Sequence, residues 1–167
     1  MRFSTMPCLT LILLLVVSPS LDAEFLRVEV AFQDTGCVSC MASLESRLGR
    51  VRGMEKVEID LDRGVAIMYL APKNRVRLTP LLARITQDGT KILGTKVEAR
   101  GVIESLQQGL TFTPSGINQT YRLALEGEAE GTIPESNFTY RLRGSVAETG
   151  LGSEPLLTAS TVKAEAR

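Results

Sequence analysis

The chain has 167 residues, and its nineteen lysines and arginines balance its nineteen aspartates and glutamates. A net charge of zero gives no basic surplus that would favour nucleic acid or an anionic membrane as a partner. The chain contains no histidine, which excludes Ser-His-Asp and Cys-His catalysis, histidine-ligated zinc and the usual general base near neutral pH. Sulfur and carboxylate groups remain for metal or redox chemistry.

The first 23 residues have the order of a secretory signal peptide. A basic residue follows the initiator methionine, an apolar run covers residues 9–17, and Ala23 is a small residue at the expected cleavage point. The apolar run is too short to span a bilayer stably, although an uncleaved membrane anchor is the alternative. We therefore expect residues 1–23 to be removed and to be the only part of the chain that meets a membrane.

Removal of this leader takes away Cys8 and leaves Cys37 and Cys40 as the only two thiols. Two cysteines are too few for a disulfide-built scaffold. An exported protein also meets an oxidising compartment, so a disulfide between Cys37 and Cys40 is one interpretation of the pair.

Hydrophobic periodicity predicts the elements on both sides of the cysteine pair. Apolar and polar residues alternate over residues 26–32, which predicts a strand with one buried face. The loop that follows contains Gly36, which tolerates backbone conformations closed to other residues. After the pair, apolar residues at helical spacing predict a helix that ends before Gly53.

The next residues predict two strands, a helix and another strand. Alternation predicts strands over residues 57–61 and 65–70, joined by a tight turn. Thr79 followed by Pro80 has the character of a helix N-cap and first helical position. A further strand is expected over residues 92–99. The order βαββαβ within about 75 residues is that of a ferredoxin-like sandwich.

From Val102 onwards, short β-rich runs alternate with Gly, Pro and Ser breaks and lack helical periodicity. This pattern predicts a small all-β unit, and an OB-like barrel is the suggested form of that unit. The expected fold class is therefore α+β, with a ferredoxin-like domain over residues 24–100 and a small all-β domain over residues 101–167. The second domain lacks the basic surplus and the aromatic residues of a single-strand nucleic-acid platform.

Residues 25–100 resemble a heavy-metal-associated domain, the module found in copper chaperones, metal-pumping ATPases and periplasmic mercury-binding proteins. The resemblance rests on five features that occur in the family's order: Cys37-Val38-Ser39-Cys40 after a strand, Leu44 and Leu48 at helix-core spacing, Arg52-Gly53-Met54 at a turn, Glu58-Ile59-Asp60-Leu61 as a strand, and Gln87-Asp88-Gly89 as a loop. Two positions depart from the family, which usually has methionine where this chain has Thr35 and often an aromatic residue where it has Thr90.

The resemblance implies that Cys37 and Cys40 bind a soft metal ion. Thiolates select Cu(I) or Hg(II), and also accept Zn(II), Cd(II) or Ag(I), over hard cations. By the same resemblance, Thr35 and Gly36 support the metal loop, and Lys91 offsets the charge of the thiolate pair, although a solvated surface lysine is the plainer interpretation of Lys91. The expected partner is a metal-transporting membrane protein or another metal carrier, and the expected compartment is a bacterial periplasm.

Two other functions remain open for the pair. A thiol-disulfide oxidoreductase also places CxxC between a strand and a helix, with Cys37 as its nucleophile. The third interpretation is an interaction domain in which the pair forms a structural disulfide. A metal carrier needs no catalytic residue, because the ion passes between partners as one sulfur replaces another. The sequence therefore favours a non-enzymatic carrier or scavenger of soft metal.

Overall fold

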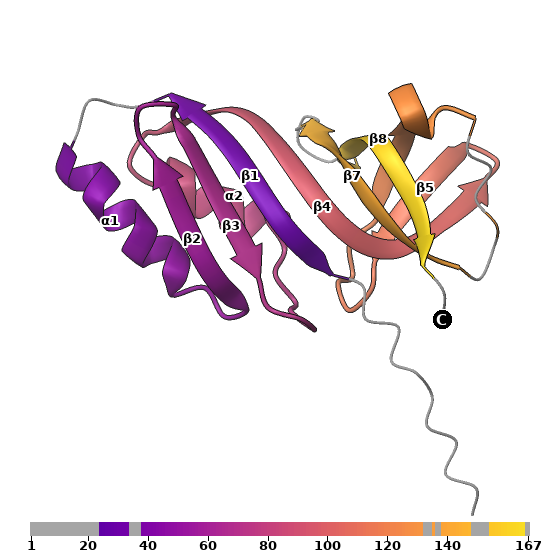
Figure 1. Ribbon diagram of the computed structural model, residues 1–167, viewed down its shortest axis with the longest axis horizontal. Helices are drawn as coiled ribbons and strands as arrows, with labels where there is room; N and C mark the ends of the chain where they lie inside the picture. Colours follow the sequence, from indigo (N-terminus) through magenta and orange to yellow (C-terminus); the bar gives the residue numbers. More distant parts are fainter. Residues whose placement is uncertain (1–23, 34–37, 132–134, 136–137, 148–153, 166–167) are drawn as a thin grey trace, which may run out of the picture.

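The computed structural model describes residues 24–33, 38–131, 135, 138–147 and 154–165, and the side chains of residues 38–42 are outside this description. Within the described part, eight strands form one mixed sheet accompanied by two α-helices and a short 3₁₀ helix (Figure 1). The elements in chain order are β1 (Phe25–Gln33), α1 (Val38–Gly49), β2 (Met54–Asp60), β3 (Val65–Leu70), α2 (Leu78–Thr86), β4 (Lys91–Leu106), β5 (Gly109–Pro114), β6 (Tyr121–Leu125), η1 (Gly127–Ala129), β7 (Thr139–Ala147) and β8 (Leu156–Glu165).

The expected fold class, a ferredoxin-like βαββαβ sandwich followed by a separate small all-β domain of OB-like form, is wrong. The strands follow the order β2-β3-β1-β4-β5-β6-β8-β7 in a single sheet, and β4 also pairs with β7. The protein is therefore mostly β, and no separate second domain follows the helices.

The long strand β4 explains this difference. Its 16 residues run without interruption through the boundary that was expected between residues 100 and 101. Its first part pairs with β1, and its later residues pair with β5, while β7 pairs with it across the middle. Figure 1 shows β4 curving from the helix-bearing strands into the second half of the chain. Because β4 pairs with both β5 and β7, the strands β4, β5, β6, β8 and β7 close into a ring.

One hydrophobic core extends through both halves. Leu44 and Leu48 of α1, and Leu81 and Ile85 of α2, are buried together with the residues of β1 that point toward them. The same cluster of buried residues continues into the ring, where it includes Leu142. Each fully buried Leu or Ile side chain contributes roughly 1.5–3 kcal/mol. This shared burial, together with β4, joins the halves into one unit.

Most predicted elements of the first half are confirmed, including the strand at 26–32 within β1 and the helix that ends before Gly53. The predicted cap at Thr79 is wrong, because α2 begins at Leu78 and Arg77 occupies the cap position without a side-chain cap bond. No helix in the described ranges combines the length and apolar character needed to cross a bilayer. The predicted signal peptide, residues 1–23, lies outside the described residues.

Candidate functional site

The predicted metal-binding residues lie at one end of the helix-bearing strands. Thr35, Gly36 and Cys37 are outside the described residues, and Cys40 is the third residue of α1, with only its backbone described. Lys91 is exposed and is the first residue of β4. It pairs in register with Gln33, the last residue of β1. The pairing of β1 with β4 therefore brings Lys91 to the strand end from which the chain leads toward Cys37.

Asp88 joins α1 to the turn that precedes Lys91. The Nη2 group of Arg47 on α1 donates a hydrogen bond to Asp88 Oδ2 at 2.7 Å. The hydroxyl of Thr90 donates to Asp88 Oδ1 at 2.6 Å, and the Thr90 backbone N–H donates to the same oxygen at 3.3 Å. These contacts stabilise the ionised carboxylate and lower the pKa of Asp88 to about 2, the Thr90 hydroxyl having the largest effect. The helix that carries Cys40 is thus tied to the turn beside Lys91.

Asp88 and Arg47 were not among the predicted site residues. The Asp-Gly-Thr spacing is typical of an aspartate that bonds the backbone two residues later, so it could have predicted the contact with Thr90. The contact with Arg47 spans 41 positions in the sequence and has no local signal. Thr90 is buried, and its hydroxyl donates to Asp88.

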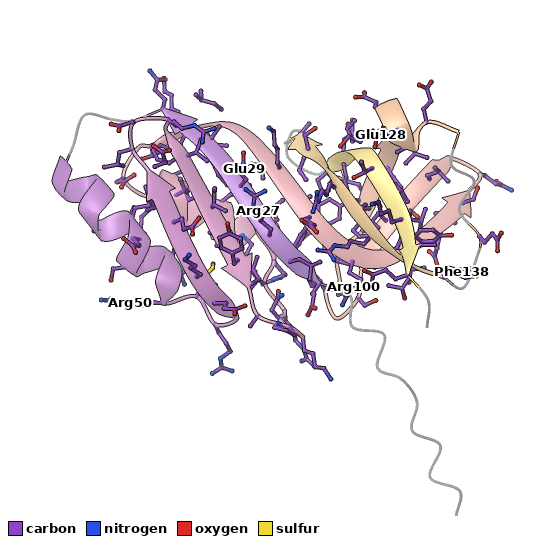
Figure 2. The ribbon with its side chains drawn as sticks, viewed as in Figure 1. Arg27, Glu29, Arg50, Arg100, Glu128 and Phe138 are labelled. Carbon is purple, nitrogen blue, oxygen red and sulfur yellow. The ribbon has the colours of Figure 1, made fainter. Side chains whose placement is uncertain are left out.

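Two rows of residues, all polar or charged except Ile67, cross the sheet on the face away from the helices, which we call the charged face. Successive residues of a strand point to opposite faces, and the alternate residues of β1 are buried beneath the helices. Taken from β2 to β8, directly opposite positions make a first row of Lys56, Tyr69, Arg27, Glu98, Arg143 and Thr161, and a second row of Glu58, Ile67, Glu29, Lys96, Ser145 and Thr158. Figure 2 shows Arg27 and Glu29 on this face, and Figure 1 shows α2 behind it.

Glu98 is the most buried carboxylate of the charged face, with 9% of its side chain exposed. Arg141 Nε donates to its Oε1 at 2.6 Å, and Arg143 Nε lies 3.0 Å from Oε2. Burial by itself raises the pKa of this carboxyl, but the hydrogen bonds and charges of Arg143 and Arg141 outweigh it and leave the pKa below its ordinary value. Glu98 is therefore an ionised anchor for two arginines.

A cleft of about 410 Å³ opens on the charged face where β4 leaves β1 and meets β7. Arg27, Glu29, Lys96 and Glu98 line it, and Gly144 forms part of its wall. A Cβ atom at Gly144 would lie 2.1 Å from the carbonyl oxygen of Thr158 on β8, so only glycine allows the two strands to approach this closely. The cleft combines both signs of charge, which gives it no preference for an anion or a cation.

Among the side chains that the structure describes, no three Cys, Asp or Glu groups converge as metal ligands. No protein-family model matches the chain, and a search of curated proteins finds no match to it either. The function is therefore inferred from the chain's own residues.

Proposed function

We propose that the protein is an exported carrier or scavenger of a soft metal ion that binds between the thiolates of Cys37 and Cys40. One observation supports this most strongly. Cys40 belongs to the first turn of α1, which follows β1 after a short connection, and the exposed Lys91 pairs with the last residue of β1. A thiol in the first turn of a helix, three positions after a second cysteine in the chain and with a lysine at the same end of the sheet, suits exchangeable binding.

The chemistry of this arrangement comes from the helix and from sulfur. The positive end of the helix dipole lowers the pKa of a thiol in the first turn and favours the thiolate that binds metal. Two thiolates hold Cu(I) or Hg(II) at low coordination, and Zn(II), Cd(II) and Ag(I) are also accepted. Lys91 would offset part of the negative charge of the bis-thiolate complex. With few ligands, the ion can leave when a partner's sulfur replaces one of the two.

The proposed setting is the periplasm of a bacterium, reached through the signal peptide at residues 1–23. The proposed partner is a metal-transporting membrane protein or another metal carrier, because an exported two-sulfur site needs a donor or an acceptor for its cargo. No catalytic residue is required for this exchange, so the proposal is not an enzyme.

The decisive experiment is an anaerobic titration of the reduced protein, residues 24–167, with Cu(I) against a competing chelator. The control is the Cys37→Ser/Cys40→Ser double variant. We expect tight one-to-one binding that the double variant loses. If the wild type binds no better than the double variant, the carrier proposal fails, and a disulfide that is more easily reduced than a structural one would then indicate an oxidoreductase.

A further inference from the structure

We infer that β7 and β8 carry a binding site for a small oxyanion of phosphate type, formed by Arg141, Arg143 and Lys163. A cleft of about 400 Å³ lies over these two strands. Its lining consists of these three cations together with Thr161 and Glu128. The site is distinct from the cysteine pair, and the inference does not depend on the proposed metal function.

The register of the sheet brings like charges directly opposite one another at this place. Arg100 on β4 is opposite Arg141 on β7, and Arg141 is opposite Lys163 on β8. Arg100 is labelled in Figure 2. Three cations in one row across adjacent strands repel each other, and such opposite pairs destabilise a sheet. A nearby negative group would relieve this repulsion.

The protein's own carboxylates neutralise only part of the charge of Arg100, Arg141 and Lys163. Arg100 is paired with Glu165, with 2.5 Å between Nε and Oε2, and its Nη1 approaches the buried Glu24 at 3.8 Å. Arg141 and Arg143 share the single carboxylate of Glu98. Lys163 is exposed, and no ion pair joins it to any carboxylate of the described residues.

The charged groups around the cleft have a net positive charge that one anion would neutralise. Three cations line it, against Glu128 on its wall and the Glu98 carboxylate that two of the arginines share. One positive charge therefore remains in excess. This excess suits a small anion rather than a long polyanion, which would need a wider basic surface.

The arginines are held in a position that suits an oxyanion. Glu98 contacts Arg141 through Nε and Nη2, and contacts Arg143 through Nε and Nη2 as well. Within the described part of the chain, the Nη1 group of each guanidinium makes no hydrogen bond or ion pair, so another acceptor can bind it. Arginine forms directional hydrogen bonds to phosphate oxygens, and lysine adds a compact charge. Thr161 lines the same cleft, and its side chain carries a hydroxyl donor.

The test is a titration of the protein, residues 24–167, with inorganic phosphate at an ionic strength kept constant with chloride. The amide chemical shifts of the protein are measured at each phosphate concentration. We expect saturable shifts on β7 and β8. The Lys163→Gln variant should bind phosphate about tenfold more weakly, since a charge-assisted hydrogen bond is lost. The matched control is Lys96→Gln, which changes an exposed lysine of the same face outside this cleft.

Two results would overturn the inference: shifts that never saturate, or equal weakening by Lys163→Gln and Lys96→Gln, which would indicate general screening only. Because Lys163 has no ion-pair partner in the described part of the chain, its variant is expected to fold, and a thermal melt verifies this. Sedimentation with phosphatidylcholine vesicles, with and without phosphatidylglycerol, separates the two sources of phosphate. Vesicle binding that phosphate displaces assigns a lipid headgroup, and phosphate binding without vesicle binding assigns a free anion.

Discussion

Glu98 on β4 and Arg143 on β7 lie directly opposite each other, with 3.0 Å between Arg143 Nε and Glu98 Oε2. On the other side of β4, Glu98 is opposite Arg27 of β1. One buried carboxylate thus stands where the helix-bearing strands meet the ring. Its ion pairs with Arg141 and Arg143 hold β4 against β7 at this place.

The substitution Glu98→Gln should destabilise the protein by about 1–2 kcal/mol, because Arg141 and Arg143 lose their shared carboxylate. The cost is below that of a fully buried pair, since the arginine side chains are 44% and 66% exposed and water can solvate them. Urea unfolding measures the change. The control Glu104→Gln, at an exposed position of β4, should shift stability by less than about 0.5 kcal/mol. Equal effects of the two variants would show that Glu98 is not an anchor.

The substitution Gly144→Ala should cost about 3 kcal/mol or more, because the new methyl group would overlap the backbone of β8. The Thr158 oxygen lies 2.1 Å from the added Cβ, and the Ala159 Cα lies 2.8 Å from it. Gly94→Ala is the matched control in β4, where nothing lies within 4 Å of an added Cβ. Thermal unfolding compares the two. A Gly144→Ala variant as stable as Gly94→Ala would contradict the close approach of β7 and β8.

The contacts of Asp88 predict a dependence of stability on acid pH. Its pKa is about 2 in the folded protein, below the ordinary value of 3.8. A lowered pKa stabilises the fold fully above the unfolded value, and this stabilisation is lost as pH falls from about 4 toward 2. The free energy of unfolding of the wild type should therefore exceed that of Asp88→Asn by about 1–2 kcal/mol at pH 6, and this difference should shrink progressively below pH 4.

Urea unfolding from pH 6 to pH 3 tests this dependence. The control Asp62→Asn changes an exposed turn residue and should follow the wild-type curve. A constant difference between wild type and Asp88→Asn across this range would rule out the ionised contact of Asp88 with Arg47 and Thr90.

The proposed role of Lys91 predicts that Lys91→Gln weakens Cu(I) binding by about threefold, because an exposed charge contributes well under 1 kcal/mol. Lys96→Gln removes an exposed lysine elsewhere on β4 and should leave the affinity unchanged. The chelator competition used for the cysteine variants measures both. If the two variants bind Cu(I) equally, Lys91 is a solvated surface lysine and has no part in the site.

Local patterns predicted the elements of the first half because strand and helix periods are properties of neighbouring residues. The strand at 26–32 and the helix ending before Gly53 follow from such periods. The predicted fold class is wrong because the change of pattern at Val102 indicates a new β-rich unit but not whether that unit is separate from the first. In the structure β4 continues through Gly101, where an added Cβ would be 2.5 Å from the Thr113 oxygen on β5. The pairing of β4 with β1, β5 and β7 joins strands that are far apart in the chain, so it has no local pattern in the sequence.

The sequence by itself determined the chemistry that this protein has available. It contains no histidine and three cysteines, two of which, Cys37 and Cys40, lie between a strand and a helix that local periodicity predicts. Only the tertiary structure decided that Glu98 meets Arg141 and Arg143, across 43 and 45 positions. Contacts of this kind depend on which strands pair and in which register. That choice is made by packing and hydrogen bonding over the whole sheet, and it has no local pattern in the chain.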